Sequence, residues 1–201
     1  MNLWYLLVAL LVQTNGHIDQ KGQALKSFYL SLHVDDLWLA GHHVNWETGE
    51  PDDPGATQSI KSHCSAFVAA ACERLHYYII RPPEHSQELL ANAQYDWLNS
   101  NAGAAAGWRR LDAQGAYRQA QGLANEGKVV VAIVRNPDPH KPGHAALIMP
   151  DEKSEEALAA DGPEVIMAGQ ENYVSTSLRN GFRHHLKAWP ENVVVFYVME
   201  H

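Results

Sequence analysis

Cys64 is the residue of this chain whose position most clearly suggests chemistry. It lies in the stretch SHCSAFVAAACER (62–74), where a helical reading places Phe67, Val68 and Cys72 on one apolar face. Cys64 falls on that face in the first turn, beside the unpaired N–H groups and the positive end of the helix dipole. Such a position favours the thiolate, the nucleophilic form of cysteine. The stretch therefore predicts either a nucleophile at Cys64 or a thiol that fills the core.

Cys72, the second cysteine, is expected to belong to the core. Eight residues separate it from Cys64, which in a helix is about 12 Å along the axis. A disulfide requires Cα atoms within about 7 Å of each other. The two thiols therefore cannot be bridged to each other if the helix forms.

His144 is the best candidate for the base that a cysteine nucleophile needs. It opens an apolar run directly after Pro142 and Gly143, so it is expected at the edge of a sheet, where it can face a helix packed on that sheet. Gln170 and Asn172 follow the next apolar run and alternate to the same side. A neutral amide at either position could accept a hydrogen bond from one imidazole nitrogen and leave the other for the thiol.

The elements that must position these residues divide the chain into a helical half and a strand-rich half. Helices are expected at 24–32, in the stretch that contains Cys64, from Ser86 to Trp97, and from Asp112 to Asn125. β-Branched and apolar runs predict four strands, at 129–134, 144–149, 164–169 and 193–199. This order indicates an α+β fold, with N-terminal helices packed on a C-terminal antiparallel sheet.

A polar segment, GHHVNWETGEPDDPGATQS (41–59), reads as a long loop because of its Gly, Pro and acidic residues. Long loops within compact domains are usually functional or disordered. Because this one leads directly to the Cys64 helix, it is expected on the substrate side, with Trp46 as a substrate contact.

Composition limits the classes of function. The chain has 201 residues, 46% of them hydrophobic and 19% charged, which is enough for one core without structural disulfides or a structural metal. A net charge of −8 argues against nucleic acid and against an anionic membrane surface as the main partner. Residues 17–201 are expected to form a single domain.

The first 16 residues, MNLWYLLVALLVQTNG, have the length and order of a secretory signal peptide. The apolar run from Leu3 to Val12 is too short to span a bilayer as a helix. No Lys or Arg precedes it, so an N-terminal element that docks on the core is the alternative. A signal peptide predicts a secreted or periplasmic protein without stable membrane insertion after processing.

Three motifs together carry a resemblance to a known family. HCSAFV with its alanine-rich continuation, then GHAALIM, then GQENY, resemble the NlpC/P60 and CHAP group of papain-like cysteine peptidases and amidases, over roughly residues 58–173. The resemblance implies Cys64 as nucleophile, His144 as general base and acid, and a residue of GQENY as the group that orients His144. Most members cut peptide or amide bonds in bacterial peptidoglycan, so the implied substrate is peptidoglycan or a peptide. An inhibitor or immunity protein could be a further partner.

The chain also departs from the family's pattern. His63 stands where members often carry Asp or Asn, and it could be a second base, a substrate contact or a surface residue. At the position where CHAP domains have a glutamate, this chain has Gln170, which is the first candidate for the group that orients His144. Asn172 is the second candidate. Gln58 matches the spacing of the oxyanion-hole glutamine in papain-type enzymes, where it would assist the backbone N–H of Cys64.

Two other classes stay open at this point. The first is a zinc site that uses Cys64 and several histidines; the sequence has no HxxxH pair on a helix and no CxxC, so neither a metal nor another cofactor is expected. The second is a catalytically inactive module of the same fold, in which tryptophans line a glycan or peptide groove. A cysteine amidase or acyltransferase that acts on another substrate is the alternative enzyme.

Overall fold

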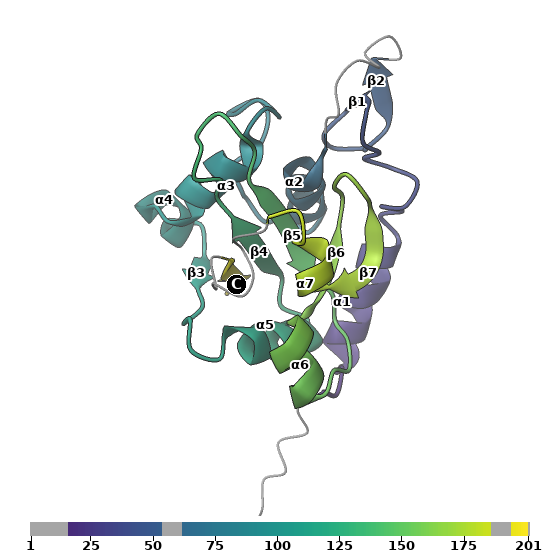
Figure 1. The fold of residues 1–201 in the computed structure, drawn as a ribbon, viewed down its shortest axis with the longest axis vertical. Coiled ribbons are helices and arrows are strands. Elements are labelled where there is room, and N and C mark those ends of the chain that lie inside the picture. Colours follow the sequence, from purple (N-terminus) through teal and green to yellow (C-terminus); the bar gives the residue numbers. More distant parts are fainter. Residues whose placement is uncertain (1–15, 54–61, 186–193, 201) are drawn as a thin grey trace, which may run out of the picture.

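The chain folds as an α+β domain in a computed structural model that describes residues 16–53, 62–185 and 194–200 (Figure 1). The helices are α1 (Gln20–Leu30), α2 (Cys64–Arg74), α3 (Leu90–Leu98), α4 (Asn101–Ala105), α5 (Ala116–Asn125), α6 (Glu155–Asp161) and α7 (Leu178–Gly181). The strands are β1 (His43–Val44), β2 (Pro51–Asp53), β3 (Trp108–Arg110), β4 (Val130–Val134), β5 (His144–Ile148), β6 (Glu164–Met167), β7 (Tyr173–Ser177) and β8 (Val195–Met199).

The main sheet has six strands in the order β3-β8-β4-β5-β6-β7, and each neighbouring pair is antiparallel. The four predicted strands form its centre, and β4 and β5 form an antiparallel hairpin. The expected α+β class with an antiparallel sheet is therefore confirmed. The short strands β1 and β2 form a separate two-stranded sheet.

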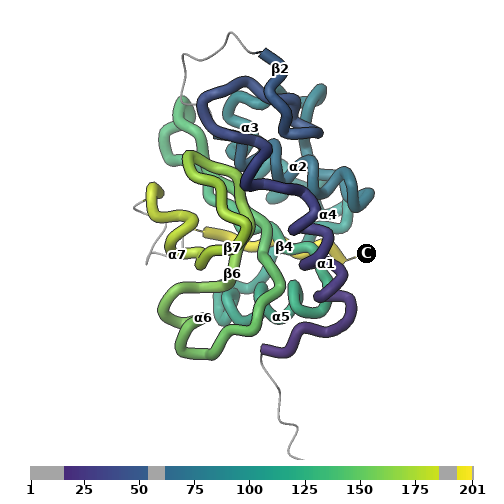
Figure 2. Tube along the Cα trace, turned by 90° about the vertical axis from the view of Figure 1, so that its right-hand side faces the viewer, coloured from purple at the N-terminus to yellow at the C-terminus, as the bar shows by residue number. Residues whose placement is uncertain are grey.

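The sheet separates two hydrophobic clusters, because successive side chains of a strand point to opposite faces. On β5, Ala145 and Leu147 belong to the cluster that contains the α2 residues, whereas Ala146 and Ile148 belong to the cluster that contains residues of α5 and α7. Figure 2 shows α1 and α2 on one side of the sheet and α7 on the other. The two faces of the strand that begins at His144 thus meet different helices.

Helix α2 is buried on every side over its first nine residues, which are 64–72. Its small side chains, mostly alanine, let it lie between the sheet and the N-terminal elements. Cys72 is fully buried in that cluster and both cysteines are free thiols, as predicted. The helix was predicted to begin two residues earlier, but Ser62 precedes it and His63 is its N-cap.

Several sequence predictions for the helical half were wrong in detail. The segment 99–107, which reads as a loop, contains α4, whose first turn is capped by the Ser100 hydroxyl. The helices predicted to start at Ser86 and at Asp112 begin later, as α3 and α5. Gly127 follows α5 with a φ of 80°, a left-handed conformation that glycine adopts without strain.

Four further short elements of the described residues were not predicted. They are the edge strands β3 and β7 and the helices α6 and α7, of which α6 lies in the acidic segment between β5 and β6. Residues 1–15, on which the signal-peptide prediction falls, lie outside the described residues. Among the described helices, none has the length and apolar character needed to cross a membrane.

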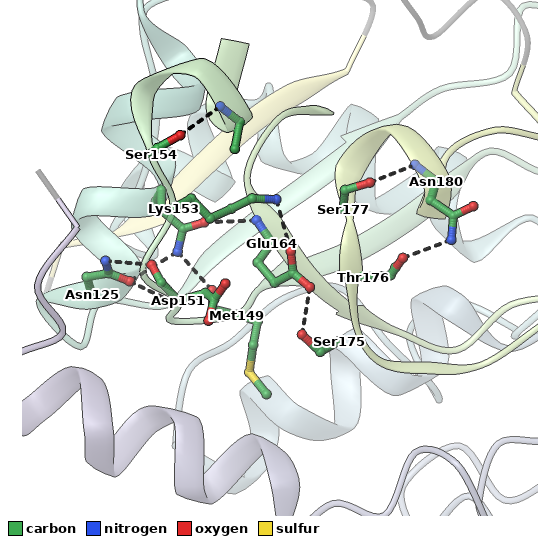
Figure 3. Close-up of polar contacts among 12 residues, drawn as sticks. Asn125, Met149, Asp151, Lys153, Ser154, Glu164, Ser175, Thr176, Ser177 and Asn180 are labelled. Carbon is green, nitrogen blue, oxygen red and sulfur yellow. Dashed lines mark hydrogen bonds and ion pairs between the residues drawn. The ribbon is translucent and has the colours of Figure 1, made fainter. Parts of the chain in front are cut away.

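A polar network holds the segment that leads from β5 to β6, far along the chain from Cys64 (Figure 3). The Asn125 side chain exchanges two hydrogen bonds of 2.9 Å with the backbone of Asp151. Lys153 forms a 3.0 Å ion pair with Glu164, which also accepts a hydrogen bond from Ser175. These bonds fix α6 and its flanking turns against the sheet.

Candidate active site

Cys64 is the first residue of α2, and its side chain lies at the wall of a cavity of about 760 Å³. The residue is only 4% exposed. Apolar side chains of Trp46 and Leu89 contribute to the lining, and polar lining comes from Gln87 and from three histidines, which are His43, His63 and His140. The cavity is within the size range of small-molecule and substrate pockets.

The Cys64 sulfur accepts hydrogen bonds from the backbone N–H groups of Ala145 and Ser65 and from the Ser65 hydroxyl. These bonds favour a negative charge on the sulfur, but burial has the larger effect and raises the pKa of the thiol. The N–H groups at the helix start thus favour the thiolate, as the helix position predicts, but burial outweighs them. The cysteine rests as a neutral thiol that faces a preformed set of N–H donors.

His144 opens β5, as predicted, next to the residue whose N–H group contacts the Cys64 sulfur. Its ring nevertheless lies on the face of the sheet opposite to α2. There it contacts Phe182 at a centroid distance of 4.7 Å and stacks on His185 at 5.2 Å. His144 Nε2 lies 3.3 Å from Met167 Sδ. A thioether sulfur can only accept, so Nε2 carries the hydrogen. Within the described residues, the ring forms no hydrogen bond with Cys64.

Burial, with neighbouring His185 and His184, lowers the pKa of the His144 imidazole to about 3. The residue is 6% exposed and lines a second, smaller cavity of about 180 Å³. His144 is therefore neutral at physiological pH. The expectation that its ring would face the helix packed on the sheet is not met in this conformation.

A thin wall separates the two cavities, because Ser62, Pro142 and Gly143 line both of them. A Cβ atom at Gly143 would lie 2.2 Å from the carbonyl oxygen of Val134 and 2.7 Å from Asn92 Oδ1. The close approach of these atoms requires glycine at this position. Cys64 and His144 are thus brought to the same end of the sheet but face different cavities.

The two residues predicted to orient His144 lie between β6 and β7, and they differ in what they contact. Asn172 Nδ2 donates to the carbonyl oxygens of Val34 at 2.5 Å and Leu37 at 2.9 Å, and its Oδ1 accepts from the N–H of Gly169. These contacts make Asn172 a structural tie between the sheet and the N-terminal region. Gln170 is exposed and lines the same cavity as His144.

Of the other predicted site residues, His63 and Trp46 line the Cys64 cavity. His63 is only 4% exposed, which excludes the surface reading, and its Nε2 donates to the His42 carbonyl oxygen at 2.8 Å. The Trp46 ring lies 5.9 Å from the Arg81 guanidinium. Gln58, the predicted oxyanion residue, lies outside the described residues.

The sequence reading missed the hairpin of β1 and β2, which lies within the segment interpreted as a loop. His43 on β1 lines the Cys64 cavity and its Nδ1 is hydrogen-bonded to Asp52 on β2. The connecting turn shows the available signal: Asn45 Oδ1 accepts two backbone N–H bonds, and Gly49 has a φ of 79°. Asn and Gly at such spacing are typical turn residues.

The tryptophans and the potential metal ligands are not arranged as a tryptophan-lined groove or a zinc site at Cys64 would require. Trp38 and Trp108 are buried in the core cluster and do not line the Cys64 cavity. Across the residues that the structure describes, only His33, Asp35 and Asp36 bring three potential ligand atoms within 4.8 Å of one another. All three are exposed, and none lines the Cys64 cavity.

Comparisons with known proteins add no family to this picture: a scan against family models found no match, and a search of curated proteins found none either.

Proposed function

We propose that the protein is a cysteine hydrolase that cleaves amide bonds through Cys64. The observation that carries the proposal is the position of the thiol, at the N-terminus of a buried helix, at the wall of a 760 Å³ cavity, with its sulfur bonded to backbone N–H groups. Helix N-termini stabilise anions, both a thiolate and an oxyanion that develops next to it.

The proposed reaction has two steps. The Cys64 sulfur attacks the carbonyl carbon while a histidine takes the thiol proton, and the backbone N–H of Cys64 stabilises the oxyanion. Collapse expels the amine, which receives that proton, and leaves a thioester on Cys64. Water then attacks the thioester, the histidine again takes and returns a proton, and the product carboxylic acid leaves with the thiol restored.

The motif resemblance assigns the histidine role to His144, oriented by Gln170 or Asn172. In the described conformation His144 Nε2 is bonded to Met167 Sδ, so this assignment requires the ring to turn from the cavity it lines toward Cys64. The Asn172 amide is held by Val34 and Leu37, which leaves Gln170 as the orienter in that arrangement.

The substrate class and the location rest on the sequence motifs. HCSAFV, GHAALIM and GQENY together support a papain-like NlpC/P60 fold and peptidoglycan stem peptides as substrate. The apolar run of the first 16 residues supports a secreted or periplasmic protein. A cysteine amidase or acyltransferase on another substrate uses the same steps and stays the alternative, since the thiol and its donors do not encode what is cut.

Digestion of purified peptidoglycan sacculi tests this proposal. Wild-type protein is expected to release soluble fragments with new amino and carboxyl ends, which mass spectrometry locates at one type of amide bond. Cys64→Ala is expected to release none, because no other group replaces the thiol. Cys72→Ala is the matched control, since its thiol is fully buried in the core, and it should cleave like wild type. Equal fragment patterns from wild type and Cys64→Ala would refute the proposal.

A further inference from the structure

His43 and Asp52 form a polar pair at the same cavity as Cys64, on a hairpin that the motif resemblance does not include. His43 Nδ1 is hydrogen-bonded to Asp52 Oδ1, and His43 and Cys64 both line the 760 Å³ cavity. We propose that His43, oriented by Asp52, is the catalytic base that accepts the Cys64 proton. This inference rests on the proposed function and gives its histidine role to His43 in place of His144.

The bond to Asp52 sets the tautomer of the His43 ring. A carboxylate only accepts hydrogen bonds, so Nδ1 must carry the hydrogen that it shares with Asp52. In the neutral ring Nε2 is then the nitrogen with a lone pair, which is the atom that a general base uses. In catalytic triads, a carboxylate that is hydrogen-bonded to Nδ1 orients the histidine ring, so that Nε2 can act as base toward the nucleophile.

Hydrogen bonds to the residues before and after His43 attach the hairpin to the surroundings of Cys64. The carbonyl oxygen of His42 accepts from His63 Nε2 at 2.8 Å, and that of Val44 accepts from Gln87 Nε2 at 2.8 Å. His63 directly precedes Cys64 in the chain, and Gln87 lines the same cavity. The residues on either side of His43 are therefore held by residues of the Cys64 cavity.

A second set of contacts fixes the far part of the hairpin. Val44 is fully buried in the core cluster, and the carbonyl oxygen of Trp46 accepts from Trp38 Nε1 at 2.9 Å. Arg74, the last residue of α2, donates to the carbonyl oxygen of Glu47 at 3.0 Å. Figure 1 shows the hairpin on the α2 side of the domain. The same helix thus begins at Cys64 and, at its other end, holds the turn between β1 and β2.

The described hydrogen bonds of the other histidines near Cys64 differ from those of His43. His140 also lines the cavity, but its hydrogen bond is a backbone one, from its N–H to Asp138 Oδ1. His63 Nε2 is bonded to a backbone carbonyl, which cannot stabilise an imidazolium as a carboxylate does. His144 lines the other cavity and is bonded to a thioether. The ring of His43, by contrast, is hydrogen-bonded to the Asp52 carboxylate.

In the proposed step, His43 Nε2 accepts the thiol proton, directly or through one water, as the sulfur–carbon bond to the substrate carbonyl forms. The imidazolium is stabilised by Asp52, which stays ionised. When the carbon–nitrogen bond breaks, the proton passes from Nε2 to the departing amine. Asp52 is a positioning residue in this scheme, because it acts on the reaction through His43.

Alkylation of Cys64 by iodoacetamide tests the inference without a substrate. The rate constant is measured by quenched peptide mass spectrometry from pH 5 to pH 9 in wild type, His43→Gln, Asp52→Asn, Asp52→Glu, His144→Gln and His17→Gln. Histidine ordinarily changes charge between pH 5 and 8, so wild type should show an inflection in that range. His43→Gln should lose the inflection and react about tenfold more slowly at pH 7.

The remaining variants give the comparison. Asp52→Asn should react more slowly at pH 7, because the carboxylate that fixes the tautomer of the His43 ring is gone. Asp52→Glu, which keeps a carboxylate, should restore the rate, whereas a purely structural role of Asp52 would predict no such rescue. His17→Gln, at an exposed residue that lines neither cavity, should keep the wild-type profile. His144→Gln shows whether the residue that the motif resemblance assigns carries the role instead. Thermal unfolding of each variant shows that it is folded. On sacculi, His43→Gln should lower kcat/KM about 100-fold, in the range of general-base catalysis.

The outcomes separate this inference from the proposed function. If His43→Gln alkylates and cleaves like wild type while His144→Gln loses both, the inference is wrong and the hydrolase proposal stands. If wild type cleaves no peptidoglycan but His43→Gln removes the inflection, the base assignment stands and the substrate proposal fails. An inflection that survives in His43→Gln overturns the inference whatever the protein cleaves.

Discussion

At the scale of single residues, the balance between burial and local hydrogen bonds decides the protonation state of Cys64. A helix dipole contributes about 0.3–1 kcal/mol to a nearby charge, whereas each unit of pKa shift corresponds to about 1.4 kcal/mol. Burial of the thiol outweighs the N–H groups of Ala145 and Ser65, and the pKa of Cys64 is raised. The sequence predicts that Cys64 lies beside the free N–H groups at the start of a helix, but it does not show how deeply that helix is buried.

His144 couples the stability of the fold to pH. Its pKa falls from an ordinary 6.5 to about 3 in the folded protein, so between these values the unfolded chain binds more protons. Stability from the neutral ring is therefore present above pH 6.5 and is lost as pH falls toward 3. Urea unfolding should show a loss of about 2 kcal/mol between pH 7 and pH 5 from this one group.

The control for this pH effect is His144→Gln, which cannot bind a proton. Its free energy of unfolding is expected to be lower than that of wild type at pH 7, because a well-packed ring against Phe182 and His185 is lost. The difference between the two proteins should shrink toward pH 5. Parallel pH curves for wild type and His144→Gln would contradict the assignment of the buried, neutral ring.

At the scale of elements, strand β5 shows why the direction of the His144 ring could not be predicted. In a strand that is half exposed, polar and apolar residues alternate and reveal which side chains share a face. All five residues of β5 are buried, and the sequence HAALI contains no such alternation. The start of the strand and its place beside Cys64 could be predicted, but the face that His144 occupies depends on register and on the helices that cover each side.

The hairpin of β1 and β2 illustrates a second limit. Its strands have two and three residues, too few for any periodicity, and Pro51 and two aspartates are unfavourable strand residues. Tertiary contacts from Trp38, His63 and Gln87 hold it instead. The length and position of the segment predicted a functional loop, and Trp46, its predicted substrate contact, lines the Cys64 cavity.

The ion pair of Lys153 and Glu164 should matter more than the exposed ion pairs, because its side chains are only 10% and 13% exposed. Lys153→Met leaves the Glu164 carboxylate with Ser175 alone, and urea unfolding should show a loss of about 3 kcal/mol. The double variant Lys153→Met/Glu164→Leu should recover most of that loss, since no unpaired charge stays buried.

Arg118, paired with Glu155 at the surface, provides the matched control for the Lys153 variant. Arg118→Met should leave the unfolding midpoint nearly unchanged, because solvent screens an exposed pair. A Lys153→Met protein as stable as Arg118→Met would show that the buried pair contributes little to holding α6 on the sheet.

At the scale of the whole molecule, the sheet order places the functional candidates at one end and the Lys153 network at a distance from it. The helical half, the antiparallel sheet and the two unpaired cysteines follow from composition and apolar runs, and all are present. Contacts across the chain were not predictable: Asn172 binds carbonyl groups of Val34 and Leu37, more than 130 residues earlier. Such contacts depend on how complete elements pack, so motif spacing could not show that Asn172 serves the fold.

The central claim is that Cys64 carries the acyl group of the substrate. The most direct measurement mixes wild-type protein with solubilised peptidoglycan fragments, quenches with acid after milliseconds to seconds, and determines the intact protein mass and the modified peptide. The account predicts a mass increase equal to the acyl portion of the cleaved fragment, located on Cys64, which hydroxylamine removes as expected for a thioester. An acyl group on any other residue, or product release by Cys64→Ala at the wild-type rate, would contradict it.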